Sequence, residues 1–499
     1  MPDPGVPDAP VPEPPVLAFG ERQYTRSQLD ALTSGMATVL DERGVRAGDR
    51  VALMSSNRPE FVVALHAIWR LGAAVVLLST AWKRAEVDHA LALTRPSHAV
   101  GDHPVLGDAM PMLELDQPVT PGRRTFDEPD PTSDALFVFS SGTTGMPKAV
   151  RHTHGAFATA VAHWRTALAL SNGDRMQIMT PPSHILGLLN IATALDVGAW
   201  IRLHPRFDVD TMLRHIESDR ITIEMAVAPI ALALAAHPRL EDYDLSSLRY
   251  VMWCATPVTQ SVADRVTARV GVNWVTAYGA SELPVITCNV LRDARLDTVG
   301  RAVPGVRIRI ADIETGAPVP VGEDGEIQVL SQTAMAGYLP DDATAGAFHD
   351  GWYRTGDVGH LDADGWLRIT DRTKEMIKVR GFQVAPAEIE AVLHGHPAVA
   401  DCAVFGVPEA VSGEAIVAAV SRCGAVESDE LIELVADRLA SYKRPSRVAF
   451  VEEIPRLPSG KVLRRVLRER VMSASEEPAG LMSASEEPAG LMSSANREL

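Results

Sequence analysis

The chain has 499 residues, a formal net charge of −17 and 22% charged residues. At about 150 residues per domain, this length predicts roughly three structural units, and a hydrophobic content of 46% is ordinary for a globular protein with a large core. The negative charge, with no basic stretch to offset it, argues against a nucleic-acid partner.

The cysteines indicate the compartment. Cys254, Cys288, Cys402 and Cys423 lie far apart and form no Cys-x-x-Cys pair. This spacing argues against a disulfide framework or a structural zinc site, and it favours a reducing, cytoplasmic environment.

We expect neither a signal peptide nor a membrane span from the sequence. Residues 1–15 contain seven prolines and no Lys or Arg, so we expect a disordered, polyproline-type leader. The apolar tract over residues 62–78 is interrupted by His66 and Arg70. It therefore predicts a buried helix followed by a strand rather than a membrane span.

The run from Val138 to Lys148 reads Val-Phe-Ser-Ser-Gly-Thr-Thr-Gly-Met-Pro-Lys and follows an apolar stretch that predicts a buried strand. Its glycines can present backbone N–H groups, its hydroxyls add donors, and Lys148 adds a positive charge. These residues predict an anion cradle suited to phosphate. The spacing Gly142-x2-Gly145-x2-Lys148 differs from that of a Walker A loop.

From residue 16 to about 370, short apolar strands alternate with amphipathic helices. Residues 208–216 and 259–270 are helical examples, and residues 249–252 and 274–277 are strand examples. This alternation predicts an α/β architecture with largely parallel sheets.

Residues 300–370 contain more Gly, Pro and Asp, and their strands are shorter. This predicts an antiparallel or β-barrel-like unit with strands at 306–310, 326–330 and 366–369. A polar joint at 371–374 comes after the unit.

A small α+β section over residues 371–470 follows, with helices at 386–394 and 428–439 and strands at 398–405 and 415–421. The final segment, 471–499, repeats the decapeptide Met-Ser-Ala-Ser-Glu-Glu-Pro-Ala-Gly-Leu. We expect this segment to be a solvated low-complexity tail.

Four further motifs follow the loop in order: Tyr278-Gly-Ala-Ser-Glu282, Tyr353-Arg-Thr-Gly-Asp357, Asp371-Arg-Thr-Lys-Glu-Met-Ile-Lys-Val-Arg-Gly381 and Pro458-Ser-Gly-Lys461. The five together closely resemble the acyl-adenylate-forming (AMP-binding) superfamily, in its acyl-CoA synthetase branch, over about residues 20–468. The resemblance implies a large N-terminal domain over residues 16–370 and a small mobile C-terminal domain over 371–470, joined by a hinge at Asp371.

The resemblance also implies an ATP-dependent acyl-CoA ligase that first adenylates a carboxylic acid and releases pyrophosphate. Lys148, Glu282 and Lys461 would be catalytic, with Glu282 as the Mg²⁺ ligand and Lys461 bridging the acid and the α-phosphate. Asp357 would bind the ribose with help from Arg372, and Tyr278 would lie along the adenine. The remaining residues expected to contact the nucleotide are Ser140, Ser141, Gly142, Thr143, Thr144, Gly145 and Ser281.

In the second half-reaction the small domain rotates, withdraws Lys461 and brings in the segment from Lys378 to Gly381 for coenzyme A. Gly381 suits a place where the pantetheine arm passes the backbone. Lys443 and Arg444 resemble residues near the CoA phosphates, although a plain exposed basic turn is nearly as good an interpretation.

The expected acyl pocket has several departures from the family. No Asp stands in Pro181-Pro-Ser-His-Ile-Leu-Gly187 to bind an α-ammonium group, so we predict a non-amino acid substrate. Trp253, Cys254 and Ala255 replace smaller residues of relatives. We therefore expect a hydrophobic acid, either aryl, alicyclic (terpenoid) or medium-chain, in a pocket formed by His184, Gly187, Trp253, Cys254, Ala255, Thr256, Gly279 and Ala280.

Other functions remain open. The enzyme could keep only one half-reaction, such as thioesterification of a preformed adenylate, or load a carrier-protein thiol instead of CoA. An oxidising luciferase and a nucleotide-binding pseudoenzyme are further alternatives. The resemblance leaves both a monomer and a homodimer open.

Overall fold

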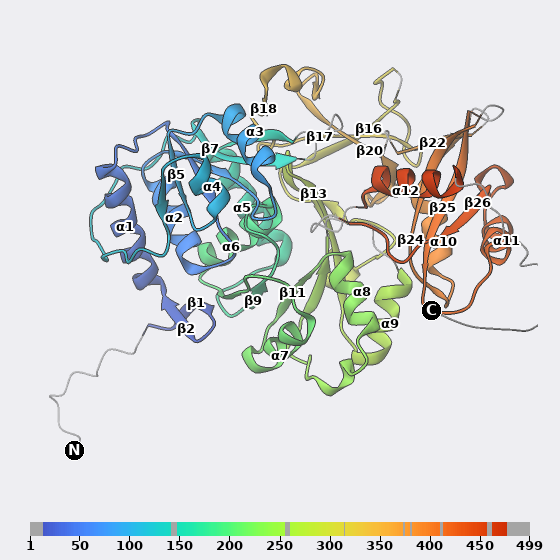
Figure 1. The fold of residues 1–499 in the computed structure, drawn as a ribbon, viewed down its shortest axis with the longest axis horizontal. Helices are drawn as coiled ribbons and strands as arrows, with labels where there is room; N and C mark the ends of the chain where they lie inside the picture. Colours follow the sequence, from blue (N-terminus) through green and yellow to red (C-terminus); the bar gives the residue numbers. More distant parts are fainter. Residues whose placement is uncertain are drawn as a thin grey trace, which may run out of the picture.

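The computed structural model describes residues 13–140, 147–254, 260–313, 315–372, 375–379, 382–409, 413–456 and 462–476. Within these ranges the chain forms four β-sheets with helices packed on them (Figure 1). A large sheet-rich N-terminal part and a small C-terminal part confirm the predicted fold class.

The largest sheet has nine strands in the order β15-β14-β13-β12-β11-β9-β10-β1-β2. The pairings from β1 through β13 are parallel, as the alternation of strands and helices predicted. The strands are β1 Pro15–Phe19, β2 Arg22–Thr25, β9 Arg175–Ile178, β10 Trp200–Leu203, β11 Ile223–Ala226, β12 Tyr250–Trp253, β13 Trp274–Ala280, β14 Leu283–Cys288 and β15 Arg301–Ala302.

The second sheet has seven strands in the order β18-β8-β7-β4-β3-β5-β6. The predicted anion cradle at residues 140–148 is called the phosphate loop below. The strand predicted before it is β7, and the strand after it is β8, which pairs with β7 in the antiparallel direction. The strands are β3 Arg50–Met54, β4 Ala74–Leu77, β5 His98–Gly101, β6 Met112–Glu114, β7 Asp134–Ser140, β8 Lys148–Thr153 and β18 Gly337–Leu339.

Helices cover both faces of these sheets. The largest core joins the inner faces of the two sheets to α1 (Arg26–Glu42), α2 (Pro59–Arg70), α5 (His154–Leu168) and α6 (Ile185–Val197). The outer face of the seven-stranded sheet packs on α3 (Arg84–Thr94), near α4 (Pro104–Ala109). The outer face of the nine-stranded sheet packs on α7 (Val209–Asp219), α8 (Ala228–Ala236) and α9 (Gln260–Val270).

The tract over residues 62–78 forms part of α2 and then β4, as predicted. The helices in the described part of the chain are all too short or too polar to span a bilayer. Short 3-10 turns occur at η1 Leu240–Asp242, η2 Leu291–Asp293, η3 Asp341–Thr344 and η4 Ser441–Lys443.

The unit predicted over residues 300–370 is a five-stranded antiparallel sheet. Its last strand includes Asp371 and Arg372, which pair with Val358 and Asp357. The polar joint expected to start at Asp371 therefore overlaps this strand, because the ladder continues for two more residues. The strands are β16 Arg307–Ala311, β17 Gly325–Leu330, β19 Phe348–His349, β20 Trp352–Leu361 and β21 Leu367–Arg372.

The C-terminal part has its own sheet (Figure 1), and buried side chains form a separate core on it. Its last helix continues to Glu476, past residue 470 where the tail was expected to begin, because Leu467 and Val471 pack against Phe405. The elements are β22 Ile377–Val379, β23 Phe382–Val384, β24 Val399–Glu409, β25 Gly413–Arg422, β26 Arg447–Phe450, α10 Pro386–His394, α11 Ser428–Arg438 and α12 Arg464–Glu476.

Candidate active site

The ends of the phosphate loop are fixed by an antiparallel strand pair. Ser140 ends β7, Lys148 begins β8, and the two residues are register partners. Both are partly exposed, as groups that meet a ligand must be. The loop residues Ser141, Gly142, Thr143, Thr144 and Gly145 lie outside the described residues, so their cradle role stays a prediction.

Glu282 lies in the tight turn between β13 and β14, only 9% exposed. Its Oε1 accepts a hydrogen bond of 2.8 Å from the hydroxyl of Tyr338, and its backbone oxygen accepts one of 2.8 Å from the N–H of Met335. The turn is also held at Ser281, whose carbonyl oxygen accepts a bond of 2.7 Å from Nε2 of His152. The carboxylate therefore has a defined position.

His152 is a neutral donor in this arrangement. Burial lowers its pKa to about 4, and a carbonyl oxygen can only accept, so the proton belongs on Nε2. The ring is fully buried and comes from β8, the strand that begins with Lys148. One strand thus supports both the phosphate loop and the turn that carries Glu282.

The proposed nucleoside residues also meet. Asp357 on β20 is 4% exposed, and its Oδ2 accepts a hydrogen bond from the hydroxyl of Tyr278 on β13. The Asp357 N–H donates to Oγ1 of Thr355 at 3.0 Å. Arg372 is the register partner of Asp357 in the neighbouring strand, so the structure brings the backbones of these two residues together.

Two glycines are required by close backbone approaches. A Cβ on Gly279 would lie 2.1 Å from the carbonyl oxygen of Pro284, and one on Gly187 would lie 2.3 Å from that of Pro181. Real Cβ atoms do not tolerate such distances. Gly279 therefore permits the β13–β14 hairpin, and Gly187 lets the first turn of α6 pack on residues 180–181; Ala280 ends β13 beside the hairpin.

The expected acyl-pocket residues separate onto two faces. His184 caps α6 by accepting the Leu186 N–H on Nδ1, and burial lowers its pKa to about 4, so it is neutral. Trp253 is 1% exposed and packs on Trp274 in the core beneath α8 and α9. Cys254 lies instead in the core shared with α6.

Strand alternation explains this split, since successive side chains point to opposite faces. Trp253 points away from α6, and Cys254 is the member of the pair on the α6 side. Burial raises the pKa of the Cys254 thiol to about 12, which makes it a packing residue and a poor nucleophile. Ala255 and Thr256 lie outside the described residues.

The C-terminal candidates that the structure describes make their contacts within the C-terminal part of the chain. Lys443 forms an ion pair with Glu388 of α10, and Arg444 next to it is exposed. The backbone of Lys378 belongs to β22, in the sheet with its own core. Gly381 and Lys461 lie outside the described residues, and the hinge role of Asp371, on β21, stays a prediction.

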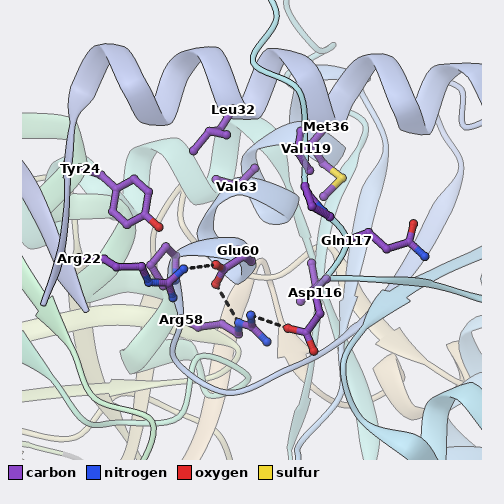
Figure 2. Close-up of a pocket in the computed structure, with 13 residues that line it drawn as sticks. Arg22, Tyr24, Leu32, Met36, Arg58, Glu60, Val63, Asp116, Gln117 and Val119 are labelled. Atoms are coloured by element: carbon purple, nitrogen blue, oxygen red, sulfur yellow. Dashed lines mark hydrogen bonds and ion pairs between the residues drawn. The ribbon is translucent and has the colours of Figure 1, made fainter. Parts of the chain in front are cut away.

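A cavity of about 370 Å³ lies elsewhere, between β2, α1, α2 and residues 115–119 (Figure 2). Arg58 bonds Glu60 at 2.8 Å and Asp116 at 2.7 Å, and Arg22 bonds Glu60 at 2.7 Å. The charges at this cavity neutralise one another, and none of the predicted site residues lines it. We therefore expect the active site at the Glu282 turn, where several of the predicted residues contact one another or their neighbours.

Sequence reasoning missed Tyr338 and His152. Tyr338 reaches Glu282 across 56 residues of chain, and His152 reaches Ser281 across 129. Neither residue stands in a motif singled out above. Only the placement of β8 between β7 and β18 brings these side chains to the turn.

Comparison with known proteins identifies the family. The model of the AMP-binding enzyme family matches residues 8–339, and that of the AMP-binding enzyme C-terminal domain matches residues 388–461. 4-Coumarate–CoA ligase 1 of Solanum tuberosum is 34% identical over 489 residues, covering 90% of this chain and 89% of the relative. Feruloyl-CoA synthase of an Amycolatopsis species is 34% identical over 479 residues, covering 92% and 96%.

Solved structures agree with this result. ATP-bound MatB from Rhodopseudomonas palustris superposes with a TM-score of 0.87 at 27% identity, covering 94% of this chain and 98% of that one. The amide bond synthetase McbA from Marinactinospora thermotolerans superposes with a TM-score of 0.84 at 30% identity, covering 92% and 97%. The chain belongs to the AMP-binding enzyme family, in its acyl-CoA ligase branch.

Proposed function

We propose that the protein activates an aromatic carboxylic acid with ATP and transfers the acyl group to coenzyme A, releasing AMP and pyrophosphate. The proposal is supported by the contacts that hold Lys148, the Glu282 turn and the Tyr278–Asp357 pair, to which we assign the phosphate contact, the metal ligand and the ribose acceptor. The free thiols of all four cysteines agree with a reducing, cytoplasmic setting.

The first half-reaction joins two anions. A carboxylate oxygen of the acid attacks the α-phosphorus of ATP, and the bond to pyrophosphate breaks. Lys148 and the loop donors neutralise the charge that develops on pyrophosphate, while Lys461 neutralises the acid and the α-phosphate. Asp357 accepts hydrogen bonds from the ribose hydroxyls, and Tyr278 lies along the base.

The Glu282 carboxylate, together with the phosphates of ATP, offers the oxygen ligands that Mg²⁺ prefers. Oε2 of Glu282 has no hydrogen-bond or ion-pair partner among the described residues, and this part of the chain holds no cluster of three or more acidic, His or Cys side chains suited to a metal. Mg²⁺ is typically held by one or two carboxylates together with substrate phosphates. When bound, the ion would supply charge neutralisation and orientation of the phosphate oxygens.

In the second half-reaction a thiol must reach the acyl-adenylate, which is a mixed anhydride of the acid and AMP. The CoA sulfur attacks the acyl carbonyl carbon, the bond to AMP breaks, and the thiol proton is released. We propose that rotation about Asp371 replaces Lys461 with the segment from Lys378 to Gly381 in this step. Lys443 would have to leave Glu388 before it could contact a CoA phosphate.

The acid is proposed from the pocket and from the relatives. Residues 181–187 contain no carboxylate to bind an α-ammonium group, and the neutral His184 offers no charge. Two of the relatives are named for 4-coumarate and ferulate, which are aromatic acids. An aromatic acid without an amino group therefore fits best.

A panel of acids tests this assignment. We expect hydroxycinnamic or benzoic acids to exceed hexanoate and cyclohexanecarboxylate by at least about tenfold in kcat/KM, roughly the discrimination that apolar pockets achieve, and phenylalanine to give no thioester. Thioester formation would be followed by absorbance and mass. Reaction with amino acids alone, or a preference for medium-chain acids, would contradict the aromatic assignment.

A second acceptor deserves a test because one structural relative is an amide bond synthetase. The same adenylate would then react with an amine instead of a thiol. Offering CoA and a primary amine together, with one aromatic acid and ATP, should give mainly thioester. Amide as the main product would assign the amine-accepting function instead.

A further inference from the structure

Tyr338 lies beside the start of the phosphate-loop strand. Its strand, β18, pairs with β8, and the register places Tyr338 opposite Val150, two residues from Lys148. Diagonal neighbours at this spacing are within reach of long side chains. Accordingly, Nζ of Lys148 lies 5.4 Å from the centroid of the Tyr338 ring, within the range of a cation–π contact.

The other end of the same side chain reaches the turn. The Tyr338 hydroxyl donates to Oε1 of Glu282 at 2.8 Å, and Met335, three residues earlier, donates its N–H to the Glu282 carbonyl oxygen at 2.8 Å. The segment from Met335 to Tyr338 thus contacts Glu282 through both main chain and side chain.

Tyr338 is itself held in place. Its N–H donates to Oγ1 of Thr344 at 2.9 Å, and Tyr353 lies close enough to its hydroxyl for each phenol to influence the pKa of the other. Tyr353 is 4% exposed and packs edge-on against Phe348 at 5.7 Å between ring centroids. A donor fixed on both sides gives its acceptor a single position.

The Tyr338 side chain also contacts two groups of opposite charge, Lys148 and Glu282. Among the described residues Lys148 forms no ion pair, and Glu282 bonds to the Tyr338 hydroxyl rather than to an ammonium. If the two charges met directly, each would neutralise the group that a phosphate or a metal ion needs. An aromatic side chain that contacts both keeps them near each other but unpaired.

We propose that Tyr338 is a positioning residue of the adenylation site, which holds the Glu282 carboxylate through its hydroxyl and the Lys148 ammonium against its ring. This inference rests on the proposed function, because it takes Glu282 as the Mg²⁺ ligand and Lys148 as a phosphate contact. Tyr338 stands outside the sequence motifs. Its hydroxyl contact with Glu282 and its ring contact with Lys148 can be tested separately.

The test compares Tyr338→Phe with Tyr338→Leu by titration calorimetry, with an α,β-methylene analogue of ATP as the probe. Phe keeps the ring and loses the hydroxyl, so affinity measured with Mg²⁺ should fall about tenfold, the low end for a hydrogen bond to a charged group, while affinity measured in EDTA should stay unchanged. Leu loses both contacts, so its affinity should also fall in EDTA.

The kinetic results should follow the same division. In Tyr338→Phe the Mg²⁺ concentration for half-maximal rate should rise about tenfold, with kcat at saturating Mg²⁺ changed far less. Tyr243→Phe is the matched control, since the Tyr243 hydroxyl also donates to a carboxylate, Oδ1 of Asp210, at 3.2 Å and lies away from the site. Its Mg²⁺ dependence and thermal midpoint should match the wild type.

Glu282→Gln separates failure of this inference from failure of the function. If Glu282→Gln loses Mg²⁺-dependent binding while Tyr338→Phe matches the wild type, the positioning role is overturned and the metal-ligand role of Glu282 stands. If neither variant changes Mg²⁺-dependent binding, both are overturned. Equal losses with Mg²⁺ and EDTA in Tyr338→Phe, together with a lowered thermal midpoint, would reduce Tyr338 to a structural residue and also overturn the proposal.

Discussion

Alanine in place of Lys461 is expected to lower adenylation about 10²–10³-fold, the usual loss when one preorganised charge stabiliser of a transition state is removed. Lys461 stands in Pro458-Ser-Gly-Lys461, a turn that can deliver an ammonium to the acid and the α-phosphate. Because the proposed second half-reaction withdraws this lysine, thioester formation from a supplied acyl-adenylate should stay within about threefold of the wild type.

Pyrophosphate exchange into ATP measures the first step, and reaction of synthetic acyl-adenylate with CoA measures the second. Arg465→Ala is the matched control, because Arg465 is an exposed basic residue of the same segment and should affect neither step. Equal losses in both half-reactions would contradict a lysine that serves adenylation alone. Wild-type rates of pyrophosphate exchange in the Lys461→Ala variant would mean that Lys461 is a solvated surface residue without a role in adenylation.

Glutamine in place of Glu224 is expected to stabilise the protein at pH 8 and to leave its stability nearly unchanged at pH 5. Glu224 on β11 is 1% exposed, and Nε2 of Gln177 donates to its Oε2 at 2.7 Å. Burial raises the pKa of this carboxyl from 4.5 to about 8, so the folded protein keeps a proton here that the unfolded chain has released.

The sign follows from proton counting. Between pH 4.5 and about 8 the folded state binds more protons at Glu224 than the unfolded state, so the free energy of unfolding falls as pH rises through this window. The two pKa values correspond to roughly 5 kcal/mol at most. Glutamine does not titrate and can still accept the bond from Gln177, so it removes this loss.

Denaturant unfolding of both proteins at pH 5 and pH 8 measures the effect. Glu241→Gln is the control with the opposite shift, since hydrogen bonding to Arg269 lowers the pKa of Glu241 to about 2. The free energy of unfolding of Glu241→Gln should differ from that of the wild type by the same amount at pH 5 and at pH 8. If Glu224→Gln also shows a constant difference, or is less stable at pH 8, Glu224 is ionised in the folded protein.

Local patterns predicted several of the residues that the fold brings together at the proposed site. Lys148 follows an apolar strand, and the motifs ending in Glu282 and Asp357 contain polar residues that the fold does gather. The supporting contacts could not be predicted in the same way. Tyr338 and His152 act across 56 and 129 residues, and such contacts depend on strand order, which no local spacing contains.

The remaining differences also have physical causes. Trp253 was expected to line the acyl pocket, but the alternation of side chains along β12 turns it into the core under α8 and α9. Helix α12 continues to Glu476 because Val471 adds one more buried contact to it. The strand β21 includes Asp371 because the ladder with β20 persists past the point where apolar residues end.

The central claim is that the acid is activated as an acyl-adenylate, and oxygen labelling tests it most directly. An aromatic acid with both carboxylate oxygens as ¹⁸O would be converted with ATP and CoA, and the products would be analysed by mass spectrometry. We predict AMP carrying one ¹⁸O atom and a thioester carrying the other. Label in phosphate with release of ADP, or AMP without label, would contradict attack of the carboxylate on the α-phosphorus.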